Sequence, residues 1–352
     1  MSEFQCVVVE VGKIGKHPNA DTLSITHVNG QYPVVFKTGD YAVGDKAVYI
    51  PVDSIVPKDD PRWAWLEGHN RIKARKLRGL FSMGMLMKIE CSCIAIFDST
   101  GTVEHQGHCL TLCAVGVNVQ EHLGIEKYEP PILAATHGAN VGGPLNQFPT
   151  YDLEAYRRYP YVLKTGEEVV ITEKIHGANA RFTFQGGQFW VGSHRCWKAE
   201  SPNIWWQVAD KYKLRRLEER PGFTVYGEVF GYVQDLRYGA QTAEHFLAIF
   251  DIRAPDGRFL EPEDVAEFCL WLDVPQVPEL YRGPWREDLL QMAEGKTTLK
   301  GGHVREGIVI QAIPGRFDDI GRVKLKHIGE NYYTRKEGHV PLMAPAKEPV
   351  NV

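Results

Sequence analysis

The chain has 352 residues, of which 43% are hydrophobic and 24% are charged, and its formal net charge is −4 at pH 7. This composition is typical of a globular protein, the length favours two domains, and a disordered or fibrous chain is excluded. The negative balance also argues against a protein that coats nucleic acid uniformly, so a polyanion would have to bind at local patches.

The sequence carries no signal for export or for a membrane. No apolar run approaches the roughly 20 residues of a membrane helix, and MSEFQCVVVEVGKIGK lacks the basic start and apolar core of a secretion signal. Seven cysteines scattered from Cys6 to Cys269 favour free thiols over a disulfide framework. We therefore expect an intracellular protein, cytoplasmic or nuclear.

Positions 5–56 alternate β-rich runs (QCVVVEV, SITHV, YPVVFK, KAVYIPV) with turn-forming segments. Short strands at this spacing predict a small barrel or sandwich. Within and beyond this region, HPNADTLSITHV and KLRGLFSMGML resemble the tRNA-binding OB-fold modules that are appended to some aminoacyl-tRNA synthetases. The resemblance implies an OB-fold, nucleic-acid-binding domain, which we place at residues 1–128.

A basic segment, RIKARKLRG, overlaps the second of these motifs. Its cations, which have no acidic residue among them, are Arg71, Lys73, Arg75, Lys76 and Arg78. We predict that they contact nucleic-acid phosphates and that such binding weakens with salt. A solvated basic edge strand that keeps other strands from pairing is the alternative.

The segment at about 90–114 is rich in cysteine and histidine. The residues in question are Cys91, Cys93, His105, His108, Cys109 and Cys113. These side chains are possible zinc ligands, but the CxC and CxxxC spacings differ from those of common zinc modules. A β-hairpin with buried thiols is the favoured interpretation, and zinc binding stays the alternative.

Residues 129–150 form a predicted linker, since the run EPPILAATHGANVGGPLNQFP has four prolines, three glycines and no lysine or arginine. The following YDLEAYRR predicts a helix that Asp152 caps and that carries Leu153 and Tyr156 on one face. We place the second domain at residues 151–340 and a tail at 341–352.

The run EEVVITEKIHGAN predicts a strand that ends on a lysine and is followed by a turn. Alternation puts Val170, Thr172 and Lys174 on one face of this strand. After the turn, ARFTF and FWVGS predict a hairpin closed by two glycines, Gly186 and Gly187. Alone, the lysine is weak support for catalysis, because a lysine at a strand end is most often solvated.

Four further strand-like runs each place a charged residue among apolar neighbours: TVYGEVFG, LAIFDIR, REGIVI and RVKLKH. With TEKIHGAN and SHR they resemble, in order and spacing, the motifs of covalent nucleotidyltransferases, namely RNA ligases, DNA ligases and mRNA-capping enzymes. The form KxHGxN and the OB module ahead of these motifs resemble ATP-dependent RNA ligases of the Deinococcus type. This resemblance implies an α+β fold, with an N-terminal OB-fold β-barrel joined to an adenylyltransferase domain of antiparallel sheets and flanking helices.

The resemblance also implies the chemistry of three lysines. Lys174 is the expected nucleophile, which attacks the α-phosphorus of ATP and expels pyrophosphate; an amine does this only when neutral. Lys324 and Lys326 alternate along one strand, so they are expected to face the same pocket and to neutralise the α-phosphate. A solvated basic strand is the alternative for these two lysines.

Further roles follow from the same resemblance. Glu306 is expected to bind Mg²⁺ or Mn²⁺ directly or through water, with a buried salt bridge to a core arginine as the alternative. Glu228 and Arg195 are expected at the ribose. Phe250 is expected to stack on adenine, and an ordinary core phenylalanine is the alternative.

The turn after the nucleophile completes the expected nucleotide site. His176 and Asn179 are expected near the phosphates or metal-bound waters, although related motifs carry aspartate where this chain has histidine, which leaves its role open. Gly177 serves the turn. Glu173 is expected to offer its backbone carbonyl to adenine while its side chain faces elsewhere.

Together these features predict an ATP-dependent RNA ligase that forms lysyl-AMP on Lys174 and joins 5′-phosphate to 3′-hydroxyl ends in RNA or an RNA-containing duplex, in RNA nick repair. We expect a monomer. A non-catalytic RNA-binding protein is one alternative, which the presence of every charged motif residue disfavours. A capping-type nucleotidyltransferase is another, which KxHGxN and the leading OB module disfavour.

Overall fold

The computed structural model describes residues 4–89, 114–128, 138–143 and 151–338. These residues divide into two compact units: the first runs to residue 128 and includes Tyr156–Pro160, and the second holds the rest. The cysteine- and histidine-rich positions from Cys91 to Cys113, most of the predicted linker and the predicted tail lie outside the described residues. No helix in the described ranges is long and apolar enough to cross a membrane.

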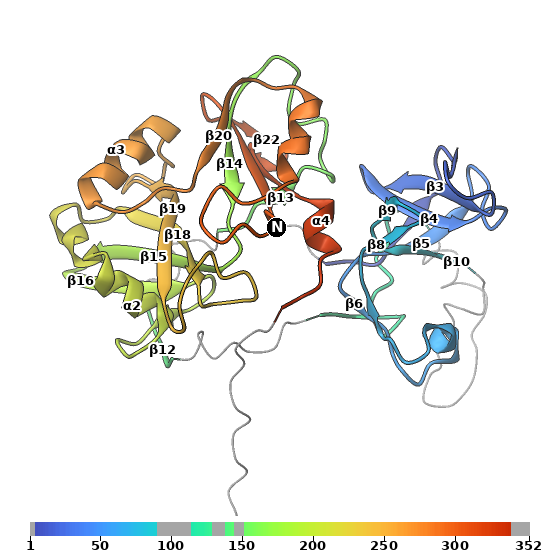
Figure 1. Cartoon of the computed structure of the whole chain (residues 1–352), viewed down its shortest axis with the longest axis horizontal. Coiled ribbons are helices and arrows are strands. Elements are labelled where there is room, and N and C mark those ends of the chain that lie inside the picture. Colours follow the sequence, from blue (N-terminus) through green and yellow to red (C-terminus); the bar gives the residue numbers. More distant parts are fainter. Residues whose placement is uncertain (1–3, 90–113, 129–137, 144–150, 339–352) are drawn as a thin grey trace, which may run out of the picture. The chain divides into compact units, whose positions relative to one another are not determined.

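The first unit consists of short antiparallel strands with one 3₁₀ helix (Figure 1). Three sheets have the strand orders β1-β5-β10, β2-β3-β4 and β11-β6-β7, and β8 pairs with β9. The elements are β1 Val7–Glu10, β2 Gly15–Lys16, β3 Leu23–Val28, β4 Tyr32–Lys37, β5 Lys46–Ile50, β6 Ser54–Ile55, η1 Pro61–Leu66, β7 Arg71–Ile72, β8 Arg75–Leu77, β9 Leu80–Ser82, β10 Met85–Lys88 and β11 Glu126–Lys127. The four β-rich runs of the sequence correspond to β1, β3, β4 and β5.

Strand β5 is buried on both faces, which explains why its sequence KAVYI is apolar without alternation. Val48 and Ile50 pack into a cluster with Cys6, whereas Ala47 and Tyr49 pack into a second cluster on the opposite face. Cys6 is a core residue, and its burial raises the pKa of its thiol to about 12.

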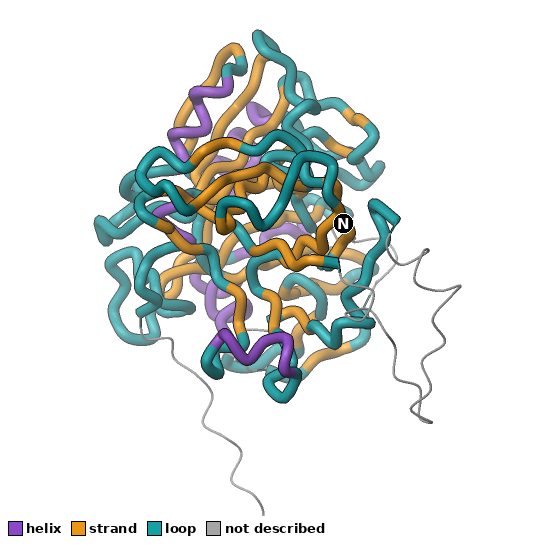
Figure 2. Tube along the Cα trace, turned by 90° about the vertical axis from the view of Figure 1, so that its right-hand side faces the viewer, coloured by secondary structure: helices purple, strands orange, loops and turns teal. Residues whose placement is uncertain are grey.

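The second unit is built on two larger sheets. Figure 2 shows that strands and loops make up most of the described chain and helices only a small part. The first sheet has the order β12-β17-β16-β15-β18-β19 and the second has the order β13-β24-β21-β14-β20. Their strands are β12 Asn140–Val141, β13 Glu154–Ala155, β14 Glu168–Lys174, β15 Ala178–Gln185, β16 Gln188–Ser193, β17 Trp197–Lys198, β18 Thr224–Gly231, β19 His245–Arg253, β20 Glu279–Pro284, β21 Gly307–Ala312 and β24 Lys324–Ile328. The remaining elements are α2 Ile204–Lys211, η4 Leu214–Glu219, α3 Pro262–Leu272, η5 Glu287–Ala293, β22 Phe317–Asp318, β23 Gly321–Arg322 and α4 Glu330–Tyr333.

The prediction of a helix that begins near Asp152 is wrong. Glu154 and Ala155 instead form β13, which pairs in parallel with β24 through Leu325 and Lys326. An isolated segment of about eight residues is too short to be a stable helix in water, and here the edge of an existing sheet offers partners for its backbone groups. The predicted hairpin is present, with Gly186 and Gly187 both at positive φ.

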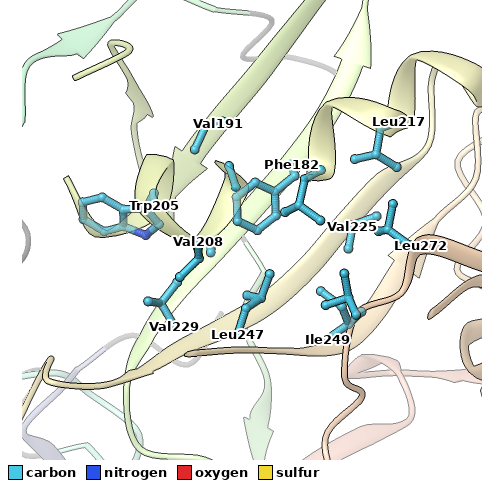
Figure 3. Packing of buried hydrophobic residues seen from close by; sticks show 14 of the residues in the cluster. Phe182, Val191, Trp205, Val208, Leu217, Val225, Val229, Leu247, Ile249 and Leu272 are labelled. Atoms are coloured by element: carbon cyan, nitrogen blue, oxygen red, sulfur yellow. The ribbon is translucent and has the colours of Figure 1, made fainter. Parts of the chain in front are cut away.

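The main hydrophobic core of the second unit lies between the first sheet and α2, η4 and α3. Figure 3 shows Phe182, Val225 and Leu247 of this sheet packed toward residues of these helices, such as Val208 and Leu217. Asn203 starts α2, because its side chain accepts hydrogen bonds from the amides of the helix's first turn. The helices therefore cover one face of the first sheet and leave its other face toward the second sheet.

Candidate active site

A cavity of about 220 Å³ lies between the two sheets of the second unit. Strands β14, β21 and β24 supply one wall, and β15, β18 and β19 supply the other. The lining residues are Tyr151, Asp152, Leu153, Thr172, Glu173, Lys174, Ile175, Asn179, His194, Glu228, Phe250, Val277, Val309, Lys324 and Lys326. The strand alternation that predicts Thr172 and Lys174 on one face is thus reflected in the cavity wall.

Lys174 is the last residue of β14, and its strand partner in β21 is Gly307. This register brings the Lys174 amine to Glu306, with Nζ donating a hydrogen bond to Oε1 over 2.7 Å. Burial lowers the pKa of Lys174, but the nearby carboxylates of Glu306 and Glu228 outweigh burial, so the pKa is raised. The amine is therefore a protonated ammonium that pairs with the carboxylate of Glu306.

Glu306 lies immediately before β21 and not inside a strand as expected. It is buried, and its second carboxylate oxygen, Oε2, has no hydrogen-bond partner among the described residues. A buried carboxylate oxygen without a partner is costly. Glu306 therefore pairs with Lys174 through one oxygen, while its other oxygen has no partner among the described residues.

Glu228 lies on β18, across the cavity from β14. Burial raises its pKa to about 8, with the charge of Lys174 and the backbone hydrogen bond from Gly177 opposing this shift. A carboxyl group with this pKa changes charge near neutral pH, so the net charge around Lys174 depends on whether Glu228 holds a proton.

The raised pKa of Glu228 predicts a pH dependence of stability. The folded chain keeps this proton up to about pH 8, whereas the ordinary value is 4.5. The folded state thus binds more protons across this window, and the free energy of unfolding falls as pH rises through it. When the pH is raised from about 5 to about 8, we expect the Tm of Glu228→Gln to fall less than the Tm of the parent. Equal losses in calorimetric scans of both proteins would contradict this assignment.

Lys324 and Lys326 both line the cavity, as their alternation along β24 predicts. Burial lowers the pKa of Lys324, although its partner Asp251 opposes the shift. Burial also lowers the pKa of Lys326, and the charge of Lys174 adds to this effect. Two partly desolvated cations thus sit beside the lysine of β14, which suits an anionic ligand.

Asp251 organises the far end of this lysine group and was not among the predicted site residues. It is 1% exposed and accepts a hydrogen bond from Lys324 Nζ over 2.8 Å. Arg322 and the hydroxyl of Tyr151 also donate to Asp251 Oδ2. The sequence signal was an aspartate within the apolar strand LAIFDIR, since a buried charge needs charged partners.

Gly177 is required by a close approach and not by a left-handed backbone. A Cβ atom at this position would lie 2.2 Å from the carbonyl oxygen of Val229 and 3.0 Å from Cγ of Glu228. The glycine therefore lets the turn after Lys174 pack directly against β18.

Gly177→Ala is expected to destabilise the protein by about 1–3 kcal/mol, because the added methyl group must push the turn away from β18. The same displacement should slow any reaction at Lys174. Gly142→Ala is the matched control, since a Cβ there meets no atom within 4 Å and its φ is not positive. Chemical denaturation of both variants checks this, and an unfolding free energy equal to that of Gly142→Ala would contradict it.

His176 is placed differently from the expectation, because it is not among the residues that line the cavity. Its ring is buried, with Nε2 2.8 Å from Asp235 Oδ1 and Nδ1 2.8 Å from the hydroxyl oxygen of Tyr332. Its backbone amide donates to the hydroxyl of Tyr238. Both ring nitrogens thus have protein partners.

Three other predicted residues lie at or near the cavity. Phe250 and Asn179 line it, and the Phe250 ring is 4.9 Å from the ring of Tyr151. Arg195 is exposed and outside the lining set, whereas the preceding residue, His194, is within it. His194 in turn contacts Asp152, with Nε2 3.2 Å from Oδ1.

Glu173 also borders the cavity, but its side chain points to a neighbouring turn, in agreement with the sequence expectation. It is 1% exposed and accepts hydrogen bonds from the hydroxyl of Thr297 and from the amide and hydroxyl of Thr298. Arg305 lies 3.4 Å from the same carboxylate. Glu173 thus anchors the 297–298 turn.

In the first unit, the basic segment divides into two kinds of residue. Arg71 is half-buried, donates to Asp53 over 2.8 Å and lies 3.6 Å above the ring of Tyr128, so it already has an anionic partner. The remaining cations are exposed: Lys73, Arg75, Lys76 and Arg78. Arg71 therefore differs from the expected phosphate contact, and the other four are placed at the surface.

The two sequence motifs of this unit are joined by hydrogen bonds. His17 Nδ1 accepts from the amide of Asn19, so its Nε2 is the donor to the carbonyl of Leu77 over 2.9 Å. The side chain of Asn19 donates to the carbonyl of Arg78 over 3.1 Å. These bonds fix the tight turn between β8 and β9, which contains Arg78 and follows Arg75 and Lys76 of β8.

Two protein families match this chain, one in each of the two units. Residues 167–327, which include both wall-forming β14 and β24, match the RNA ligase family. Residues 6–89 match an OB-fold domain family. The predicted α+β fold, with an N-terminal OB-fold domain ahead of a ligase domain of mostly antiparallel sheets, is confirmed.

Solved structures share this fold over nearly the whole chain. A point mutant of Naegleria gruberi RNA ligase with ATP and Mn has a TM-score of 0.77 at 23% identity, with 94% of this chain and 98% of that chain covered. Another mutant of the same ligase, with AMP and Mn, has a TM-score of 0.78 at 22% identity and the same coverage. The ligase with PPi has a TM-score of 0.76 at 23% identity, also with 94% and 98% covered.

One curated relative is the phenylalanine–tRNA ligase beta subunit of Psychrobacter arcticus, with 31% identity over 124 residues. The match spans 34% of this chain but only 14% of that protein.

Proposed function

We propose that this chain is an ATP-dependent RNA ligase of the Deinococcus type that forms lysyl-AMP on Lys174 and acts in the repair of RNA nicks. The observation that carries the proposal is the placement of Lys174 on a cavity wall with Glu306, Glu228, Lys324 and Lys326 around it, within a segment that matches the RNA ligase family. The Naegleria relatives, whose structures were solved with ATP, AMP or PPi, support a nucleotide as the ligand.

The proposed reaction has three transfers, the first two at the phosphorus of AMP and the third at the 5′-phosphorus of the RNA end. The neutral amine of Lys174 attacks the α-phosphorus of ATP, and pyrophosphate leaves. The AMP group then passes to the 5′-phosphate of an RNA end, which frees the lysine. Finally, a 3′-hydroxyl attacks that 5′-phosphate, AMP leaves, and a phosphodiester remains. Lys324 and Lys326 offset the charge that develops on the transferred phosphate.

The residues around Lys174 fit a divalent cation. Mg²⁺ and Mn²⁺ prefer oxygen ligands, and Mg²⁺ is commonly held by one or two carboxylates together with substrate phosphates. Glu306 Oε2 is buried without a partner, and Glu228 lies in the same cavity. The described residues hold no cluster of three His, Cys, Asp or Glu side chains suited to a metal. Such a cation would weaken the hold of these carboxylates on the Lys174 proton.

The remaining residues receive roles by position. Phe250 is suited to stack on the base at the end of the cavity near Val277, and Asn179 and Glu228 are suited to hydrogen-bond the sugar or phosphates. Arg195 would have to approach from the exposed rim to reach the ribose. In the OB-fold domain, the exposed cations from Lys73 to Arg78 are the proposed contacts to RNA phosphates.

RNA joining tests the proposal. A substrate with a 5′-phosphate and a 3′-hydroxyl at a nick, in RNA and in mixed RNA–DNA duplexes, is incubated with ATP and Mg²⁺. We expect a joined product and release of AMP, with GTP unable to replace ATP. Salt-dependent binding of RNA without any joined product would instead favour the non-catalytic alternative. Covalent labelling of the chain by GTP in place of ATP, without joining, would favour the capping-type alternative.

A further inference from the structure

The turn that follows Lys174 is tied to helix α4 and the residues just after it by a closed ring of side chains. His176 contacts Asp235 and Tyr332, each over 2.8 Å. Arg335 closes the ring, with Nη2 donating to Asp235 Oδ1 over 3.1 Å and its guanidinium 3.8 Å from the centre of the Tyr332 ring. The four residues come from three separate parts of the chain.

The charge of Asp235 determines which atom is the hydrogen-bond donor between His176 and Asp235. Burial raises the pKa of Asp235, but hydrogen bonds from His176 and Arg335 outweigh burial and lower it, so the carboxylate is ionised. An ionised carboxylate only accepts hydrogen bonds, hence His176 Nε2 is the donor. The other ring nitrogen, Nδ1, lies 2.8 Å from the hydroxyl oxygen of Tyr332. The ring is therefore satisfied without any partner from a ligand.

Hydrogen bonds also hold α4 in place. Glu294 accepts hydrogen bonds from the amides of Glu330 and Asn331 at the start of this helix. Arg335 Nη1 donates to the carbonyl of Tyr332 over 2.8 Å. The helix end thus presents Tyr332 and Arg335 in one fixed arrangement toward His176 and Asp235.

We propose that His176, Asp235, Tyr332 and Arg335 form a clamp that positions the Lys174 turn for attack on ATP, and that His176 binds neither phosphate nor metal-bound water. None of the four lines the described cavity, and the His176 and Asp235 side chains are only 8% and 5% exposed. The inference rests on the proposed function, because it assigns these residues to the reaction of Lys174.

The clamp also explains why position 176 suits histidine in this chain. An aspartate there would bring a second carboxylate toward Asp235 in a buried site, and two like charges at short distance are strongly unfavourable. Neutralising Asp235 at the same time would remove the repulsion and leave an amide able to donate to the new carboxylate. Positions 176 and 235 should therefore be coupled.

The test compares His176→Asp with the double variant His176→Asp/Asp235→Asn, and adds Tyr332→Phe, which removes only a hydroxyl. The rate of self-adenylylation at saturating ATP, the Kd for ATP and the Tm are measured for each. We expect His176→Asp to lower the rate at least about 100-fold and the double variant to recover about tenfold or more, because substitutions at two side chains in direct contact are not additive. Tyr332→Phe should lower the rate with an unchanged Kd.

Tyr161→Phe is the matched control, because it removes a hydroxyl–carboxylate bond to Asp319 at an exposed position. The clamp is overturned if the parent adenylylates and the double variant is no faster than His176→Asp, or if the Kd for ATP rises in proportion to the loss of rate. A parent that forms no adduct with ATP would instead contradict the proposed function, so the two failures are distinguishable.

Discussion

Glu306→Ala is expected to lower the rate of lysyl-AMP formation by about 100-fold or more, because a cation site contributes several kcal/mol to charge neutralisation in a transition state. The change removes the partner of Lys174 Nζ and the buried oxygen Oε2 at once. The loss should not be overcome by raising the concentration of ATP, since it affects the chemical step. Single-turnover kinetics over a range of Mg²⁺ and Mn²⁺ concentrations measures it.

Two further variants define this effect. Glu306→Gln keeps the size of the side chain and can still accept from Lys174, but it lacks the negative charge, so we expect a loss nearly as large. Glu267→Ala removes an exposed glutamate on α3 and should behave as the parent. A Glu306→Ala protein that adenylylates at the rate of Glu267→Ala, with the same metal dependence, would refute the assignment.

Asp251→Ala is expected to destabilise the protein by about 3–5 kcal/mol, the usual result of removing one partner from a buried ion pair. Asp251 is the anion for one buried and one half-buried cation, because Lys324 and Arg322 both donate to it and their side chains are 6% and 14% exposed. Without it, both positive charges remain desolvated beside the hydroxyl of Tyr151. Denaturant unfolding of the purified variant gives the free energy directly.

Asp251→Asn should fall between the parent and Asp251→Ala, because an amide oxygen can still accept a hydrogen bond from Lys324. The control is Asp256→Ala, since Asp256 pairs with Arg258 at an exposed position where ion pairs contribute little. Unfolding curves for Asp251→Ala that coincide with those of Asp256→Ala would show that this buried anion is unimportant.

Particular residues show how much of the fold and of the site can be predicted from the sequence alone. Alternation places Thr172 and Lys174 on one face of β14, and likewise Lys324 and Lys326 on β24, because a strand's period of two is a local property. The helix expected after Asp152 fails because the edge of β24, far along the chain, pairs with Glu154. Local propensity is a weak guide when a distant strand competes for the same backbone.

The sequence alone also did not predict which residues are the partners of the buried polar groups. His176 is separated by 59 residues from Asp235 and by 156 from Tyr332, and Lys324 lies 73 residues from Asp251. Neither periodicity nor motif spacing reports on contacts between such distant positions. The sequence indicated that a charge among apolar neighbours needs a partner, and only the fold identified which one.

Mass analysis of the chain after incubation with ATP and Mg²⁺, without RNA, is the most direct test of the central assignment. Intact mass followed by peptide mapping should find one AMP group, attached to the peptide that contains TEKIHGAN and carried by the amine of Lys174, and the Lys174→Ala protein should stay unmodified. An unmodified parent, or an AMP group that persists in Lys174→Ala or maps to another lysine, would contradict it.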